Sequence, residues 1–424
     1  DRSVALMKAS ESNSNYPSRL REMTNYALRE VKKVCSEIGP RESGEESERK
    51  AQSYVAESMK NVCDSVEIED FEVHPKAFMS WVVIDVVLML ISIICLLLKQ
   101  FNAIEAANTG LGIAATVCTV LSIIFMVGEF LFYKEMLDPL FPKRQSCNVV
   151  CTRKASGETK KRIVFAGHID SAYEWYYTHL GGGKLLVKMI AAAIVSIGIN
   201  LVLDIVSFFN VPHWLNIVII VLAFVTAVPV ALASIFVNWK LVVPGANDNL
   251  TGVFASMAVI RYMEANDIRF EHTDVVAIST GCEECGLRGA RAYAKKHAND
   301  GIETVAIAVD TLKDYDFMGV YNKDMSGTVT LDSQVSAMVK KASENAGLNL
   351  PYAKVFFGSS DAAAMQQGGL KASALAAMDP TPASYYHTRD DKPDILEPKT
   401  VEAGINVLLE TAFLYDSEGL KDTY

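Results

Sequence analysis

RIVFAGHID, residues 162–170, joins a strand-like apolar run to two polar residues, His168 and Asp170. In open α/β sheets, binding and catalytic sites form at the carboxyl ends of the strands. If Arg162–Ala166 is a strand, both polar residues lie where such a site is expected. A shared site then requires other strands that end in similar polar residues.

Predicted strands and helices alternate on both sides of this stretch. Before it, the sequence predicts helices over Leu20–Ile38 and Glu45–Asn61 and strands over Ser65–Val73 and Cys147–Thr152. After it, the predicted order is helix Leu250–Ala265, strand Asp274–Ser279, helix Gly286–Lys296, strand Thr304–Val309, helix Gln334–Ala346, strand Ala372–Ala377 and helix Val401–Tyr415. This alternation predicts an α/β fold with a mixed, mostly parallel central sheet and helices on both faces.

Four apolar stretches interrupt this pattern, and each is long enough to cross the hydrocarbon core of a membrane as a helix. Buried core helices rarely run this long with so little charge, so we predict four transmembrane helices in two hairpins. The stretches are Phe78–Leu98, Gly110–Tyr133, Leu185–Phe209 and Trp214–Asn238. Their charged residues are Asp85, Glu129, Lys188 and Asp204.

Each hairpin leaves and returns on the same side, so all polar segments should lie on one face of the membrane. Residues 1–77 are polar, so we expect no signal peptide before the first apolar stretch, and basic residues gather beside the polar segments rather than in the hairpin turns. The positive-inside rule then predicts a multi-pass protein with a cytoplasmic catalytic domain. Irregularly spaced Cys residues agree with a reducing compartment.

The predicted organisation is one domain in three pieces with two insertions. The pieces of the polar domain are 1–76, 135–184 and 241–424, and the transmembrane hairpins are 77–134 and 185–240. Residues 1–18 are rich in Ser and Asn, and we expect a mobile tail there.

Separate segments place His, Asp or Glu at or near predicted strand ends. Two of these residues follow RIVFAG, two follow DVVAISTGC, one ends TVAIAVD, one follows ALAAM, and one lies in the turn PGANDNLTG before a helix. This distribution is typical of a metal site. The residues are His168, Asp170, Asp248, Glu283, Glu284, Asp310 and His387.

The residue types favour a pair of zinc ions. Two His and three carboxylates can hold two metal ions about 3.5–4 Å apart that bind a hydroxide and a substrate carbonyl together. Two Zn²⁺ and three carboxylates leave a positive charge, which favours the hydroxide. A further carboxylate must stay off the metals and shuttle the proton. The neighbouring pair Glu283–Glu284 supplies both functions.

The motifs HID, GANDN-TG, CEECGLRGA, AVD and YHTRDD, in this order, resemble the signature of the co-catalytic di-zinc aminopeptidases, metallopeptidase family twenty-eight. GPRESGEESE near the start and FGSSDAAAMQQGG near the end are also similar to that family. The chain departs from the family's pattern in the gap of 80 residues between His168 and Asp248, which the second hairpin fills.

The resemblance implies a role for each metal ligand. His168 and Asp310 would bind one zinc ion, and Glu284 and His387 would bind the other. Asp248 would bridge the two ions. No ligand position is substituted in this chain.

The resemblance also implies the catalytic residues and the reaction. Glu283 would be the general base, and Asp170 would orient His168 through a hydrogen bond. The implied activity is that of an exopeptidase, an aminopeptidase that hydrolyses a peptide or aminoacyl amide bond with a metal-activated water. The alternatives are a single-zinc acyltransferase similar to glutaminyl cyclases and a catalytically inactive peptidase-like membrane scaffold.

The expected partners are membrane lipids and a peptide or aminoacyl-amide substrate. Both hairpins interrupt the chain near the predicted site, so hydrophobic or lipid-tailed substrates are included. A net charge of −10 with no basic stripe argues against nucleic acid. The sequence leaves open whether the chain forms a homo-oligomer.

Several residues near the motifs have less specific interpretations. Cys282 and Cys285 are expected to be structural thiols, because the sequence has no second CxxC to complete a zinc site. Tyr385 and Tyr386 are the nearest candidates in sequence for stabilising an oxyanion. Gly181–Gly183 favours a hinge over a phosphate loop. The run GEESERK, residues 44–50, predicts a solvated helix start.

Overall fold

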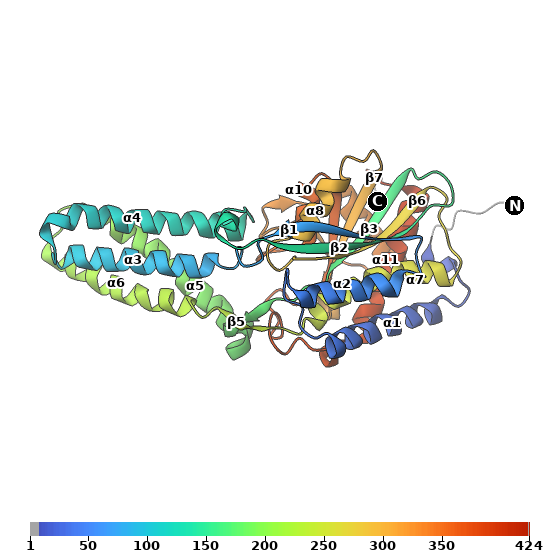
Figure 1. Cartoon of the computed structure of the whole chain (residues 1–424), viewed down its shortest axis with the longest axis horizontal. Helices are drawn as coiled ribbons and strands as arrows, with labels where there is room; N and C mark the ends of the chain where they lie inside the picture. The colour runs from blue at the N-terminus through green and yellow to red at the C-terminus, as the bar shows by residue number, and fades with distance from the viewer. Residues whose placement is uncertain (1–7, 423) are drawn as a thin grey trace. The chain divides into compact units, whose positions relative to one another are not determined.

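The computed structural model describes residues 8–422 and 424 and divides into two units (Figure 1). The α/β unit contains the described residues up to 75, residues 143–173 and the described residues from 241 onward. The helical unit contains residues 76–142 and 174–240.

A nine-stranded sheet forms the centre of the α/β unit, with the order β1-β2-β6-β3-β7-β11-β8-β10 and with β9 paired to β8. The four strands β6, β3, β7 and β11 run parallel, so their carboxyl ends share one edge. The pairs β1–β2, β2–β6 and β8–β11 are antiparallel. The bounds are β1 Ser65–Val73, β2 Arg144–Arg153, β3 Lys161–His168, β6 Thr273–Thr280, β7 Glu303–Leu312, β8 Met318–Asp324, β9 Val329–Thr330, β10 Tyr352–Lys354 and β11 Lys371–Ala377.

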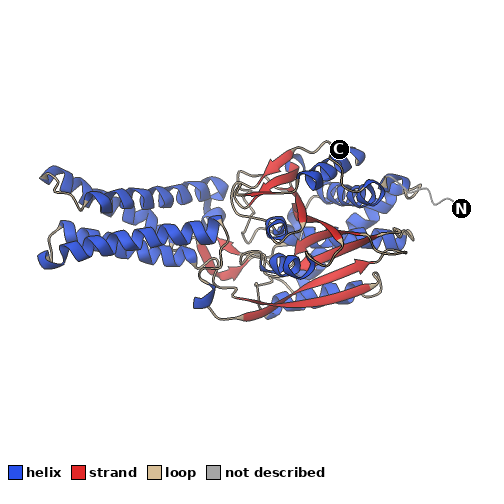
Figure 2. Cartoon of the chain, turned by 90° about the horizontal axis from the view of Figure 1, so that it is seen from above, coloured by secondary structure: helices blue, strands red, loops and turns tan. Residues whose placement is uncertain are grey.

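Helices cover both faces of this sheet (Figure 2), which confirms the predicted α/β fold class. Helices α1, α2, α7 and α11 lie on one face, and α8 and α10 lie on the other (Figure 1). The bounds are α1 Tyr16–Glu37, α2 Glu46–Met59, α7 Thr251–Ala265, α8 Arg288–His297, α9 Ser333–Asn345, α10 Asp361–Gln367 and α11 Pro398–Glu418.

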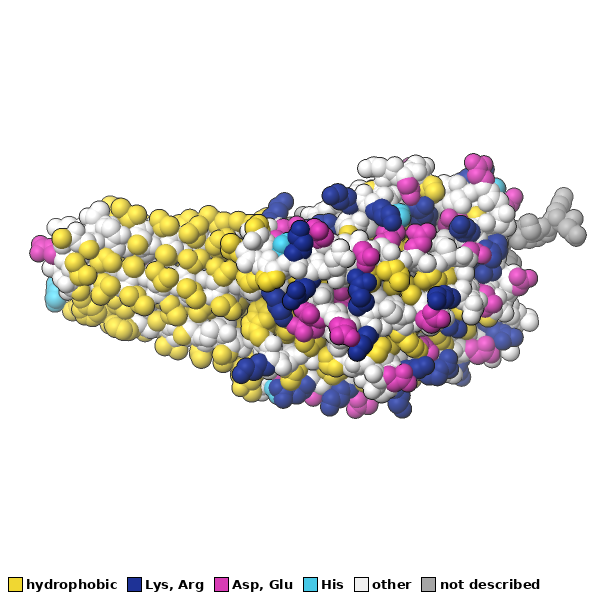
Figure 3. All heavy atoms as spheres, in the orientation of Figure 1, with side chains coloured by type: hydrophobic (Ala, Val, Ile, Leu, Met, Phe, Trp, Pro, Cys, Tyr) yellow, Lys and Arg dark blue, Asp and Glu magenta, His cyan; other side chains and the backbone are white. Residues whose placement is uncertain are grey.

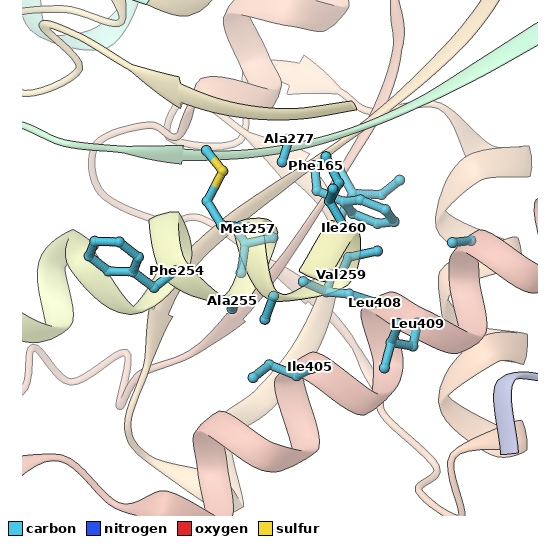
Figure 4. Close-up of a cluster of buried hydrophobic side chains, with 14 of the residues drawn as sticks. Phe165, Phe254, Ala255, Met257, Val259, Ile260, Ala277, Ile405, Leu408 and Leu409 are labelled. Atoms are coloured by element: carbon cyan, nitrogen blue, oxygen red, sulfur yellow. The ribbon is translucent and has the colours of Figure 1, made fainter. Parts of the chain in front are cut away.

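The main hydrophobic core lies between the sheet and helices α7 and α11 (Figure 4). Helix α7 is buried along nearly its whole length because it lies between the strands and α11. Burial of apolar surface is the main term that stabilises such a layer. The side chains labelled in Figure 4 are Phe165, Phe254, Ala255, Met257, Val259, Ile260, Ala277, Ile405, Leu408 and Leu409.

Helix α7 approaches β3 and β7 closely at two glycines. A Cβ on Gly167 would lie 2.3 Å from the backbone of Gly252, and a Cβ on Gly252 would lie 2.1 Å from the carbonyl oxygen of Val309. No larger residue fits at either position without a backbone shift. This contact brings His168, the last residue of β3, close to the start of α7.

The helical unit contains four helices that are long and apolar enough to cross a membrane, judged by length and composition. Hydrophobic side chains cover this unit in Figure 3, whereas Lys, Arg, Asp and Glu gather on the α/β unit. The bounds are α3 Trp81–Gln100, α4 Asn108–Phe125, α5 Tyr176–Val206 and α6 His213–Ala233, and α4 continues as a π-helical turn over Met126–Leu131. Strands β4 Tyr173–Trp175 and β5 Val237–Val242 pair in a separate two-stranded sheet.

Helix α5 is longer than the apolar stretch that predicts it. It begins at Tyr176 and is interrupted at Gly181 and Gly182, whose backbones are not helical, with φ of 68° at Gly182. The interruption lies where the sequence predicts a hinge. The predicted stretch from Leu185 is therefore only the part of α5 that follows this break.

The chain before the predicted first helix is ordered, so the expected mobile tail is wrong for residues 8–18. Helix α1 begins at Tyr16, and Ala9 lies in a short 3-10 helix. The backbone N–H of buried Ala9 donates to a carboxylate oxygen of Glu410 at 3.0 Å. Residues 1–7 of the predicted tail lie outside the described part of the chain.

Candidate functional site

The predicted site residues come together at the carboxyl edge of the parallel strands. His168 ends β3, and Asp310 is the third residue from the end of β7, so both lie inside strands rather than after them. The remaining residues lie in loops: Asp170 after β3, Asp248 before α7, Glu283 and Glu284 after β6, and His387 after β11.

Asp248 lies between the two imidazole rings. Its Oδ1 is 3.1 Å from Nε2 of His168, and its Oδ2 is 2.9 Å from Nε2 of His387. Oε1 of Glu284 is 3.3 Å from Nε2 of His387, and Oδ2 of Asp310 is 3.8 Å from Nε2 of His168.

Two groups of possible metal ligands share Asp248. One contains His168, Asp248 and Asp310, and the other contains Asp248, Glu284 and His387. In each group the ligand atoms lie within 4.8 Å of one another. A third group, His168 with Glu283 and Glu284, satisfies the same distance.

The site is buried and carries more negative than positive charge. Burial raises the pKa of Glu283 and Asp310 well above their usual range and that of Glu284 to about 7. Burial disfavours the charged form of the imidazoles, but the surrounding carboxylates outweigh it and raise the pKa of His387 to about 10 and that of His168 well above its usual value. Additional positive charge at this place would relieve the repulsion between the carboxylates.

This donor set fits zinc. Imidazole nitrogens and carboxylate oxygens are both common zinc ligands. Among the described residues, Nε2 of His168 and Oε1 of Glu284 are buried and accept or donate no hydrogen bond. A divalent cation beside each of these atoms would satisfy it, at the point where the carboxylates crowd together.

Asp170 contacts both the ring of His168 and the backbone that carries Glu283 and Glu284. Its Oδ1 lies 3.4 Å from Nδ1 of His168, and its backbone oxygen lies 3.0 Å from the same nitrogen. Its carboxylate also accepts hydrogen bonds from the backbone N–H of Glu283 at 3.1 Å and of Glu284 at 3.0 Å. The sequence predicts only the contact with His168, because the second contact depends on how the loop after β6 folds back.

Asp391 orients the Asp248 loop and is not among the predicted site residues. Its two carboxylate oxygens accept hydrogen bonds from the backbone N–H of Asn247 at 2.7 Å and of Asp248 at 3.0 Å. The available signal is the second Asp of YHTRDD, four residues after His387.

Arg41 is a second residue that sequence reasoning missed. Its side chain is fully buried and donates to the backbone oxygens of Ile169 at 2.7 Å, Pro244 at 2.7 Å and Gly245 at 3.0 Å. Arg41 therefore joins the loop after β3 to the loop before α7. Nothing in the GPRESG turn indicates burial, since a charged residue beside Gly and Pro usually predicts an exposed loop.

The aromatic and thiol groups beside the motifs have packing contacts. The hydroxyl of Tyr385 donates to Oδ2 of Asp314 at 2.8 Å, and the ring of Tyr386 stacks on His387 with centroids 3.9 Å apart. Cys282 and Cys285 are buried free thiols in a small cluster with Val73, in line with the predicted structural role.

The chain is similar to known zinc peptidases. The model of peptidase family M28 matches residues 148–412. A zinc aminopeptidase from Bacillus subtilis superposes with a TM-score of 0.53 at 13% identity, covering 95% of this chain and 96% of that one. A glutaminyl cyclase from Bacteroides thetaiotaomicron superposes with a TM-score of 0.54 at 13% identity, covering 92% of this chain and 97% of that one. Curated proteins give no match to the chain.

Proposed function

The chain belongs to peptidase family M28, and on this premise we propose that it is a membrane-anchored, zinc-dependent aminopeptidase that hydrolyses a peptide or aminoacyl amide bond. The observation that supports the proposal most directly is the position of Asp248. Its two oxygens face Nε2 of His168 and Nε2 of His387 at 3.1 and 2.9 Å. One carboxylate between two imidazoles is the arrangement that a shared ligand of two metal ions requires.

Each zinc ion would have its own pair of ligands besides Asp248. His168 and Asp310 would hold one ion, and Glu284 and His387 would hold the other. When bound, two zinc ions polarise a carbonyl group and lower the pKa of a water molecule.

Glu283 would move the proton. Its carboxylate lies at the site without belonging to either group that shares Asp248, and its Oε2 is 3.5 Å from Nε2 of His168. It would take a proton from the attacking water and deliver it to the leaving amine.

Asp170 would orient both His168 and the backbone that carries the Glu pair. A hydrogen bond to Nδ1 fixes which ring nitrogen of His168 remains available as a ligand. The same carboxylate accepts from the N–H groups of Glu283 and Glu284. Its role would therefore be to position the site rather than to contact the substrate.

We further propose that α3, α4, α5 and α6 cross the membrane and that the α/β unit lies on the cytoplasmic side. The support is the apolar composition of the four helices and the excess of Lys and Arg in the segments that flank them. An epitope inserted after Gly301, in the exposed turn between α8 and β7, is expected to resist protease outside intact cells and to be cleaved after permeabilisation. Cleavage in intact cells would show that the α/β unit lies on the opposite side of the membrane.

The substrate test is a panel of aminoacyl anilides, dipeptides and their acyl-tailed counterparts, assayed on the detergent-purified full chain. We expect turnover that a chelator abolishes and that added zinc restores. Faster turnover of acyl-tailed compounds would support hydrophobic or lipid-tailed substrates. Equal rates on tailed and untailed compounds would indicate that the helices only anchor the protein in the membrane. Cyclisation of N-terminal glutamine without amide hydrolysis would instead favour the activity named for the glutaminyl cyclase neighbour.

A further inference from the structure

Glu48 of α2 lies beside the loop that carries Glu283 and Glu284. The GEESERK run predicts a solvated helix start, but this prediction is wrong at Glu48, whose side chain is buried and only 2% exposed. Residue 48 also lies before the region that the family model matches, residues 148–412. Neither the match nor the mechanism above assigns Glu48 a role.

The carboxylate of Glu48 is hydrogen bonded to this loop and to the neighbouring strand. Its Oε2 accepts from the backbone N–H of Cys282 at 2.9 Å, and its Oε1 accepts from the hydroxyl of Ser146 in β2. Gly281 packs closely against these side chains, because a Cβ on Gly281 would lie 2.6 Å from the Ser146 hydroxyl and 3.4 Å from Oε1 of Glu48.

A second residue of α2 fixes the same helix face to the strand that leads into the loop. Gln52 lies one turn after Glu48, and its side-chain N–H groups donate to the backbone oxygens of Cys147 and Ser279, both at 2.8 Å. Ser279 is the second-last residue of β6. Helix α2 is thus tied to the end of β6 just before the Glu pair begins.

Three consecutive backbone amides of the loop therefore end on two buried carboxylates. Cys282 N–H donates to Glu48, and the N–H groups of Glu283 and Glu284 donate to Asp170. Cys282 has a φ of 54°, a backbone conformation that is uncommon and strained for residues other than glycine. The contact with Glu48 stabilises this residue immediately before the Glu pair.

We propose that Glu48 is a positioning residue for the active site, which sets the place of the Glu283 and Glu284 carboxylates by holding the amide of Cys282. This inference rests on the proposed function, since it assigns the effect to the general base and a metal ligand. A small displacement of a reacting group costs about 10²-fold in rate. Loss of the contact should therefore lower kcat more than it changes KM.

The test compares three variants of α2 in the whole chain described here, saturated with zinc. Glu48→Leu removes the acceptor, and we expect kcat to fall about 10²-fold with KM within threefold of wild type. Glu48→Gln keeps an oxygen acceptor of the same length and should restore kcat to within about tenfold of wild type. Glu46→Gln, on an exposed side chain of the same helix, is the matched control.

A second measurement keeps this inference separate from the proposed function. Hydrogen exchange of the peptide covering residues 280–289 should be faster in Glu48→Leu than in wild type and Glu46→Gln, whether or not the protein turns over substrate. Active wild type together with unchanged kcat and unchanged exchange in Glu48→Leu would overturn the role of Glu48 alone. Inactive wild type would overturn the proposed function, and exchange would still test Glu48.

Should Glu48→Leu fail to fold, Ser146→Ala provides the test. This substitution removes only the hydroxyl that donates to Oε1 of Glu48. We expect about tenfold lower kcat and faster exchange in the same peptide. Wild-type values of both quantities would overturn the inference.

Discussion

Glu283→Gln is expected to lower kcat by about 10²–10⁴-fold while the protein keeps its zinc. Glutamine has the shape of glutamate but cannot take up a proton from water and pass it to the leaving amine. Oε2 of Glu283 lies 3.5 Å from Nε2 of His168, and the residue is outside both ligand groups that share Asp248. The measurement is kcat on the best aminoacyl anilide, with zinc content determined on the same sample.

The neighbouring Glu284 provides the comparison. Its Oε1 belongs to the group with Asp248 and His387, so Glu284→Gln should weaken zinc binding, and added zinc should recover part of its activity. Excess zinc should not restore the activity of Glu283→Gln. Undiminished turnover of Glu283→Gln would refute its assignment as the base, and loss of zinc from that variant would assign it to the metal ligands instead.

Asp248→Ala is expected to release both zinc ions and to reduce activity below detection. Asp248 is the residue common to the two ligand groups, and its oxygens lie 3.1 and 2.9 Å from the two imidazole nitrogens. Its removal leaves each ion two of its three protein ligands and takes away a negative charge between the two cations. The measurement is zinc per chain after gel filtration, together with the thermal unfolding temperature with and without chelator.

Two further variants make this result specific. Asp316→Ala alters an exposed carboxylate of the same unit and should keep both ions. His168→Ala should release mainly the ion that His168 shares with Asp310. If Asp248→Ala retained one ion with wild-type affinity, Asp248 would be a ligand of the other ion only.

The types and order of the site residues could be predicted from the sequence, because each lies in a short motif. Most of these motifs follow a strand, whereas Asp248 lies in the turn before α7. The seven residues from His168 to His387 come together in the structure, and the parallel strands β3, β6 and β7 explain why. Their metal-binding and catalytic roles stay predictions until zinc and kinetics are measured.

The buried polar residues that support the site could not be predicted. Arg41 and Glu48 lie in a run of charged residues that lacks an apolar period, and such a run usually predicts solvent exposure. Both are buried because their partners come from distant segments: the backbone of Ile169 and Gly245 for Arg41, and Cys282 for Glu48. Hydrophobic periodicity reflects only residues that are close in the sequence, so it cannot indicate contacts between distant segments.

Short elements beyond residue 312 were also missed. The three-residue strand β10 and the seven-residue helix α10 are too brief for a period of two or 3.6 residues to be recognised. Strand β8 has a regular length, but its sequence MGVYNKD mixes strand formers with Gly, Asn and Asp. Pairing with β11 stabilises it despite this composition.

The most direct test of this account is the zinc content of the wild-type chain. Elemental mass spectrometry on detergent-purified protein should find two zinc ions per chain, or two ions of a substituting divalent metal. A content of one tightly held ion per chain, which does not rise to two when zinc is added, would contradict the shared role of Asp248 and favour a single-zinc enzyme. No bound metal after gentle purification and zinc resupply would contradict the metallopeptidase proposal itself.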